Sequence, residues 1–168
     1  LEPVTVSAFR DFILETPNGQ DDLVLDMPSA GHNRISGTSG KVLMESLTFS
    51  DIRTLILDLA SEEGGGDDDV TIGTAGIVGA SLVKLNAGKG DNTLALLGGS
   101  AVIDSNLGTD LGRYLSIAAL GASQLVLPES QTLRALTLAD TAKATLSGGR
   151  HRPMWVDDLV IKDSGTLD

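Results

Sequence analysis

Two glycine-rich stretches carry acidic or amide side chains at spacings that suit a hard cation. The calcium-binding nonapeptide G-G-x-G-x-D-x-U-x has glycine at positions one, two and four and aspartate at position six. Residues 63–71 place Asp68 at the sixth position, and residues 87–95 place Asn92 there, with Asp91 one place earlier. Neither stretch has glycine at the first position. The spacing therefore indicates a related, incomplete calcium motif.

The candidate metal ligands are Asp67, Asp68, Asp69, Asp91 and Asn92. Their oxygen atoms are of the kind that Ca²⁺ prefers, and a large structural repeat would bring the two stretches into stacking register. The alternative is a glycine-rich turn in which Asp and Asn side chains satisfy local backbone N–H groups. No cofactor is predicted from the sequence, and calcium is the one candidate kept open. The absence of cysteine excludes zinc-thiolate sites, disulfides and a cysteine nucleophile.

A second cluster is positively charged on an otherwise acidic chain. Arg150, His151 and Arg152 lie close to Trp155, the only tryptophan, in an expected loop. Such a loop could contact a carboxylate, a sulfated glycan or a partner chain. The alternative is a solvated loop with the tryptophan folded onto the body of the protein.

The sequence contains few residues whose spacing would suit catalysis. The nucleophile motif G-x-S-x-G does not occur. Residues Asp67, Asp68 and Asp69 are consecutive and cannot all face one way on a strand, and the pair Asp157 and Asp158 has the same problem. Neither group has an obvious basic companion. The sequence therefore predicts a protein that is not an enzyme, and polysaccharide cleavage is kept only as part of an alternative.

Composition limits the possible partners. The chain has 168 residues, with 41% hydrophobic and 3% aromatic, which suits one domain with an aliphatic core. The formal net charge of −11 argues against nucleic acid and anionic membrane surfaces as partners. No stretch approaches the roughly 20 apolar residues that span a bilayer, so no membrane insertion is expected.

The elements that must position these residues are short strands. Apolar and polar residues alternate over four to eight positions between Gly, Asp, Asn and Ser, and no sustained helical pattern occurs. The pattern predicts an all-β protein. The expected strand segments are 4–6, 23–25, 47–49, 55–57, 70–72, 82–85, 94–96, 115–117, 125–127, 136–138, 144–146 and 159–161.

Internal repeats favour one all-β architecture. The segment beginning at Leu136 aligns with that at Leu159 at an offset of 23, and the segment at Leu115 aligns with that at Leu136 at 21. The stretch at Asp68 recurs at an offset of 24, and Asp21 lies 47 residues before it, about two periods. A period of 21 to 24 predicts a parallel β-helix, or β-solenoid, of about seven coils. The alternative is a β-sandwich with accidental repetition.

Several blocks resemble those of very large Gly- and Asp-rich bacterial cell-surface proteins with autotransporter-like β-solenoid repeats. They are NRISGTSG (33–40), SLTFSD (46–51), GGGDDDVTI (64–72), NAGKGDNTL (86–94) and DLVIKDSGTLD (158–168). The resemblance covers most of the chain. It implies an extracellular or cell-surface solenoid that acts as scaffold, stalk or adhesive surface, and it carries no catalytic residues.

Residues 1–168 are therefore expected to form a single β-solenoid domain, either a segment of a longer chain or an assembling subunit. No amphipathic cap is recognisable at either end, so open ends could pair with the rest of a longer chain or with another copy. The leading functional expectation is a non-enzymatic rod: a scaffold, stalk or filament subunit with an adhesive role. The alternative is a β-helix protein that binds or cleaves carbohydrate, with glycans as partners.

Overall fold

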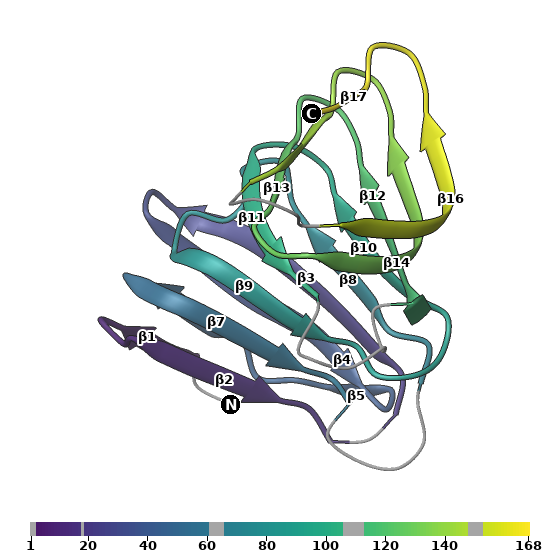
Figure 1. Ribbon diagram of the computed structural model, residues 1–168. Helices are drawn as coiled ribbons and strands as arrows, with labels where there is room; N and C mark the ends of the chain where they lie inside the picture. Colours follow the sequence, from purple (N-terminus) through teal and green to yellow (C-terminus); the bar gives the residue numbers. More distant parts are fainter. Residues whose placement is uncertain (1–2, 18, 61–65, 106–112, 148–152) are drawn as a thin grey trace.

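The protein consists of β-strands throughout the part that the computed structural model describes: residues 3–17, 19–60, 66–105, 113–147 and 153–168 (Figure 1). These ranges contain no α-helix, and hence no apolar helix long enough to cross a membrane. The all-β prediction is confirmed, and each predicted strand segment lies within a strand. The strands are β1 (Val4–Ser7), β2 (Asp11–Glu15), β3 (Asp21–Ser29), β4 (His32–Ser39), β5 (Val42–Leu43), β6 (Leu47–Ser50), β7 (Ile52–Asp58), β8 (Asp69–Ile72), β9 (Ala80–Asn86), β10 (Asn92–Leu96), β11 (Ser100–Asp104), β12 (Leu115–Ala119), β13 (Gln124–Leu127), β14 (Gln131–Leu138), β15 (Lys143–Leu146), β16 (Met154–Ile161) and β17 (Thr166–Leu167).

The strands form two sheets that each keep two free edges. The first sheet has the order β1-β6-β4-β3-β8-β10-β12-β14-β16, with β5 paired to β4, and the second has the order β17-β15-β13-β11-β9-β7-β2. From β8 onward, successive strands alternate between the two sheets. In Figure 1, β1 and β2 lie at one end of the molecule, and β16 and β17 lie at the other.

The sequence repeat corresponds to parallel pairing between strands. Leu94 pairs with Val70 at an offset of 24, and Leu136 pairs with Leu159 at 23, as the sequence predicts. The predicted offset of 21 is wrong, because Ile117 pairs with Leu136 at an offset of 19. Every described pair is parallel except the three that β4 makes with β3, β5 and β6. A sandwich of antiparallel sheets joined by hairpins therefore does not describe this arrangement.

The first third of the chain departs from the repeat. Strand β3 turns back through a hairpin to β4, and β4 pairs antiparallel with β6. Asp21 and Asp68 are consequently direct neighbours, since Asp22 pairs with Asp69 and the Asp21 N–H donates to the Asp68 carboxylate. The expectation that two periods separate Asp21 from Asp68 is wrong, because the intervening residues form the hairpin, β6 and β7.

One row of inward side chains crosses the whole first sheet. Seven of its members are no more than 7% exposed, whereas Val4 and Ile161 at its two ends are 47% and 46% exposed. In order of pairing, the row is Val4, Leu47, Ile35, Leu25, Ile72, Leu96, Ala119, Leu138 and Ile161. The core is aliphatic as predicted, and Phe49 is its only buried aromatic residue among those described. The core is thus continuous from one free edge of the sheet to the other.

Candidate functional site

The predicted acidic cluster forms a ladder of side chains at the starts of three neighbouring strands. The Asp21 N–H donates to Oδ1 of Asp68 at 2.9 Å, and the Asp68 N–H donates to Oδ1 of Asn92 at 3.0 Å. Thr16 donates its hydroxyl to Oδ2 of Asp21 at 2.6 Å. Asp68 and Asn92 therefore each accept a backbone N–H from a residue 47 or 24 positions away, whereas Asp21 accepts the hydroxyl of Thr16, five positions earlier. The alternative of purely local turn contacts does not describe these bonds.

Asp21 and Asp68 lie deep in this ladder. Their exposed fractions are 0% and 1%, and Oδ1 of Asp21 and Oδ2 of Asp68 have no hydrogen-bond partner. Burial raises the pKa of Asp68 to about 7, and the negative charges of Asp21, Asp67 and Asp69 act in the same direction. The hydrogen bond from the Asp21 N–H opposes the rise in pKa. The pair is thus a buried acidic site rather than an open cluster of carboxylates.

The outer members of the cluster also bind across strands. Oδ1 of Asp67 accepts the Asp91 N–H at 2.8 Å, and Thr93 donates its hydroxyl to Asp69. Arg134 forms an ion pair with Asp91. The five predicted ligands thus lie at or just before the starts of β8 and β10, but each has at least one oxygen engaged by a protein donor or, for Asp91, by an arginine. No group of three or more His, Asp or Glu residues arranged for a metal is found among the described residues. Calcium binding at these residues is left to direct titration.

The predicted positive loop is only partly within the described ranges. Arg150, His151 and Arg152 lie outside them. Trp155 does not belong to a loop, because it lies in β16 and pairs with Thr132 of β14. Its side chain is 59% exposed on the edge strand, so within the described residues it is not folded onto the body of the protein.

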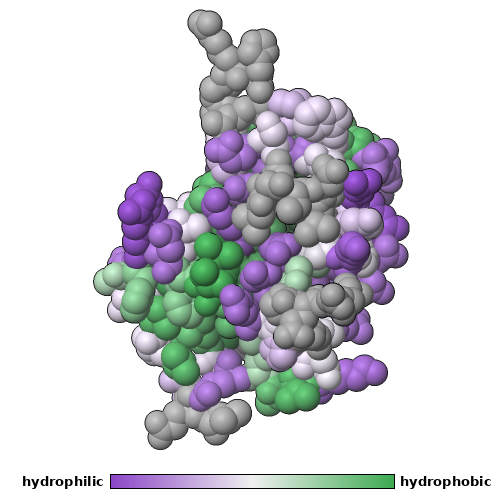
Figure 2. Space-filling model, turned by 60° about the horizontal axis from the view of Figure 1, so that its bottom comes forward, coloured by the Kyte–Doolittle hydropathy of each residue, from purple (hydrophilic) through white to green (hydrophobic). Residues whose placement is uncertain are grey.

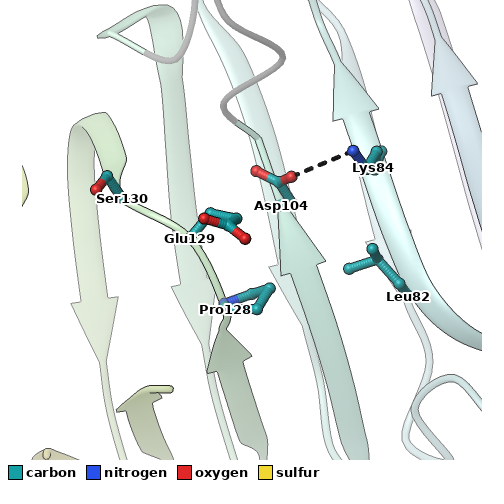
Figure 3. A pocket seen from close by; sticks show the side chains of 6 residues that line it. All are labelled: Leu82, Lys84, Asp104, Pro128, Glu129 and Ser130. Atoms are coloured by element: carbon teal, nitrogen blue, oxygen red, sulfur yellow. Dashed lines mark ion pairs between the residues drawn. The ribbon is translucent and has the colours of Figure 1, made fainter. Parts of the chain in front are cut away.

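A groove that the sequence analysis missed lies on the outer face of the second sheet. Its volume is about 500 Å³. Lys84 on β9 faces Asp104 on β11 with 3.7 Å between Nζ and Oδ2, and Glu129 lies on the other side of Asp104 in the view of Figure 3. Asp104 is nearly buried, with 5% of its side chain exposed, whereas 35% of the Lys84 side chain is exposed. The lining residues are Leu82, Lys84, Asp104, Pro128, Glu129 and Ser130.

Gln131 fixes the acidic side of this groove. Its Nε2 donates to Oδ1 of Asp104 at 3.4 Å and to the Glu129 carbonyl at 3.2 Å. Its Oε1 accepts from both the N–H and the hydroxyl of Ser105, at 3.1 and 2.6 Å. Because Gln131 is fully buried, these bonds hold Asp104 and the 128–130 segment in fixed relation.

A second hollow of about 310 Å³ adjoins the groove and shares Leu82 and Lys84 with it. It adds Arg10, Asp11 and Arg53, besides Thr54 and Ser81. Arg10 lies 3.7 Å from the Asp11 carboxylate, whereas Arg53 forms no ion pair with a described residue. Groove and hollow together present three carboxylates and three cationic side chains along one outer face. Their residues come from widely separated parts of the chain, which is why no motif indicated them.

The chain matches no family model, no curated protein and no solved structure. The resemblance to bacterial cell-surface repeat proteins therefore stays a prediction, and the arguments that follow depend on the geometry of the described residues.

Proposed function

We propose that this chain is a non-enzymatic structural module, a segment of an extracellular or cell-surface β-solenoid that acts as a rigid scaffold, stalk or filament subunit. The observation that carries the proposal is the inward row from Val4 to Ile161, which is buried everywhere except at its ends. Stacked parallel strands with a shared core resist bending because each strand inside a sheet is hydrogen-bonded to the strands on both sides. About seven coils would account for the length of the chain.

The free edges support an elongated assembly. Leu159 and Ile161 occupy the same rows as Leu136 and Leu138, yet they are 48% and 46% exposed where their neighbours are fully buried. At the opposite end, Val4, Phe9 and Ile13 are about half exposed. Figure 2 brings this lower end forward and shows hydrophobic residues gathered on it. Further strands would cover both ends, supplied by a longer chain or by another copy.

The direction of the edge strands supports the same proposal. Both edge strands of the first sheet run in the same direction, because β1 is parallel to β6 and the two antiparallel steps through β4 restore the direction of β3. All strands of the second sheet are parallel to one another. A strand added at either end can thus pair in the parallel mode that every described pair outside β4 uses.

Electron microscopy and sedimentation velocity of the purified chain test this proposal. We expect multimers or filaments whose proportion rises with protein concentration. Leu159→Glu places a charge on the open end and should reduce assembly at least tenfold, whereas Val78→Glu, at an exposed apolar residue away from the edges, should not. A chain that stays a compact monomer at every concentration would contradict the proposal.

The groove on the second sheet favours a second candidate function, carbohydrate binding. It runs across β9 and β11, has Leu82 as an apolar surface, and presents Lys84, Asp104 and Glu129 as donors and acceptors. A sugar chain offers hydroxyl groups to such side chains and a CH face to the leucine. If the glycan were also cleaved, Asp104 and Glu129 would be the paired carboxylates that hydrolysis requires.

Glycan arrays with neutral and acidic oligosaccharides, followed by calorimetry and product analysis, test this candidate. Lys84→Gln should weaken binding at least tenfold, because it removes the cation at the junction of groove and hollow. Lys89→Gln changes an exposed lysine of the 88–90 turn, away from the groove, and should leave binding unchanged. Equal binding by both variants would exclude the groove as the glycan site, and released oligosaccharide products would identify a cleaving protein.

A further inference from the structure

Three cationic side chains from three parts of the chain meet on the outer face of the second sheet. Arg10 directly precedes β2, Arg53 lies on β7 and Lys84 lies on β9, and all three line the hollow of about 310 Å³. The chain has 12 lysines and arginines against 23 acidic residues, so three cations in one hollow run against its overall charge. Such a cluster attracts a negatively charged group.

Backbone pairing holds the two arginines side by side. The Thr54 N–H donates to the Arg10 carbonyl at 2.9 Å, and Asp11 pairs with Thr54. Arg10 therefore lies opposite Arg53 across the two strands. Like charges directly opposite each other on neighbouring strands are destabilising. Because both side chains line the same hollow, an anion bound between them would relieve this repulsion.

The neighbouring carboxylates do not neutralise the hollow. Asp11 lies 3.7 Å from Arg10, but both side chains are exposed, and an exposed ion pair at this distance is weak. Asp104 lies 3.7 Å from Lys84 and compensates the charge of that lysine. Arg53 forms no ion pair with any residue in the described ranges. Its guanidinium group is therefore available to an external anion.

We propose that the hollow is a subsite for the sulfate or carboxylate group of an acidic sugar, and that the adjoining groove holds the next sugar of the same glycan. That the ligand is a sugar rests on the second proposed function, whereas the anion subsite rests on the cations alone. Planar guanidinium groups match the oxygens of sulfate and carboxylate in a bidentate way. The hydroxyl of Ser81, an exposed residue that lines the same hollow, is a further donor.

The junction of hollow and groove fixes the order of the sugars. Leu82 and Lys84 line both spaces, and Figure 3 shows them on one strand with Asp104 across from Lys84. The carboxylates of Asp104 and Glu129 lie on the groove side, where they repel a second anion and can accept hydroxyl groups of a neutral sugar. The ligand is therefore a glycan in which an acidic sugar adjoins a neutral one.

Calorimetry with matched oligosaccharides tests the proposal. The probes are glucose oligosaccharides and the same chains carrying a single glucuronate or a single 6-sulfate. Wild type should bind an acidic probe about tenfold more tightly than the neutral probe at low ionic strength, and salt should reduce the difference. Arg53→Gln should abolish this preference and leave the affinity for the neutral probe unchanged. Arg53→Lys should retain part of it, because the charge is kept and the planar fork is lost.

Arg134→Gln is the matched control for these variants. It removes the same charge as Arg53→Gln, but from an exposed residue of β14 in the first sheet, so both affinities should stay as in wild type. Equal affinity of wild type for neutral and acidic probes would overturn the anion subsite and leave carbohydrate binding standing. An acidic preference that survives in Arg53→Gln would do the same.

Inorganic sulfate separates the failure of this subsite from the failure of carbohydrate binding. In nitrogen-15 NMR of arginine-labelled protein, sodium sulfate should shift the Nε–H signals of Arg10 and Arg53 to saturation, relative to sodium chloride at equal ionic strength, and should not shift that of Arg134. This result without binding of any oligosaccharide would retain the anion subsite and exclude a sugar as its ligand. Equal shifts of all three arginines without saturation would indicate an adventitious ion only and overturn the subsite.

Discussion

The side-chain amide of Asn33 donates a hydrogen bond to the carbonyl oxygen of Gly76 at 3.0 Å, across 43 residues of sequence. The same nitrogen donates to the Asp26 carbonyl at 3.1 Å, and the amide oxygen accepts the N–H groups of Val78 and Gly79, both at 2.7 Å. Asn33 is fully buried. A single side chain therefore connects the β3–β4 hairpin to the segment that leads into β9.

Replacing Asn33 by alanine should destabilise the protein by about 3 kcal/mol or more. The substitution leaves two backbone N–H groups and two carbonyls without their partner in a site that water does not reach. Asn86→Ala is the control, because the half-buried Asn86 amide donates to Asp58 alone, and its loss should cost less than about 1.5 kcal/mol. Urea unfolding of both variants measures the difference. Equal losses would show that the Asn33 bonds contribute little.

The glycines of the incomplete calcium motif have a structural role that a substitution can test. Gly90 has a φ of +117°, and a Cβ built there would lie 2.1 Å from the carbonyl oxygen of Gly66, which precedes β8. Gly90→Ala should therefore cost about 3 kcal/mol or more, from backbone strain and from the clash between adjacent turns.

Gly31→Ala is the matched control for this prediction. Gly31 also has a positive φ, +78°, but nothing lies within 4 Å of a Cβ at that position. Its replacement should cost only about 1 kcal/mol, the strain of a left-handed backbone. Similar losses of Tm for the two variants would mean that close packing of the turns does not require glycine at position 90.

Calcium should have no effect on stability if the acidic side chains accept hydrogen bonds from neighbouring strands and do not bind an ion. Oδ1 atoms of Asp67, Asp68 and Asn92 each accept a backbone N–H of a neighbouring strand, so these oxygens are already engaged. We expect Tm to stay within about 1 °C between chelator and millimolar Ca²⁺. A rise in Tm that saturates with calcium, and that Mg²⁺ does not reproduce, would establish a specific site and contradict this expectation.

The sequence predicts the strands well wherever apolar residues alternate. Leu136-Thr-Leu138 and its pairing with Leu159 can be found from the pattern alone, because inward positions recur every second residue. Four strands with polar residues at inward positions or at their ends are missed: β2, β4, β11 and β17. The two-residue strand β5, whose apolar residues are both exposed, is too short for any alternation to show. In β4 the inward positions include Asn33, whose burial depends on the four bonds described above.

Register is harder to predict than the strands themselves. Offsets of 21 and 19 both place Ile117 beside an inward leucine of β14, because a shift of two residues leaves the facing side unchanged. The pattern could not choose between them, and the backbone pairing gives 19. The groove cannot be predicted from the sequence pattern. Lys84, Asp104 and Glu129 become neighbours only when three separate strands or loops lie side by side in the fold.

The row that crosses the first sheet gives a last prediction, which compares two residues paired side by side. Leu138 is fully buried and Ile161 is 46% exposed, although the two occupy the same inward row. Leu138→Ala should destabilise the isolated chain by about 3 kcal/mol, because it removes buried methyl groups and leaves a cavity. Ile161→Ala should cost about 1 kcal/mol under dilute conditions, where one side of the isoleucine faces water.

If the open end is covered in an assembly, the cost of Ile161→Ala should rise with protein concentration, as measured by denaturation across a hundredfold range. A cost that is constant over that range, with no multimers present, would show that Ile161 remains at an uncovered edge and would count against assembly through this face.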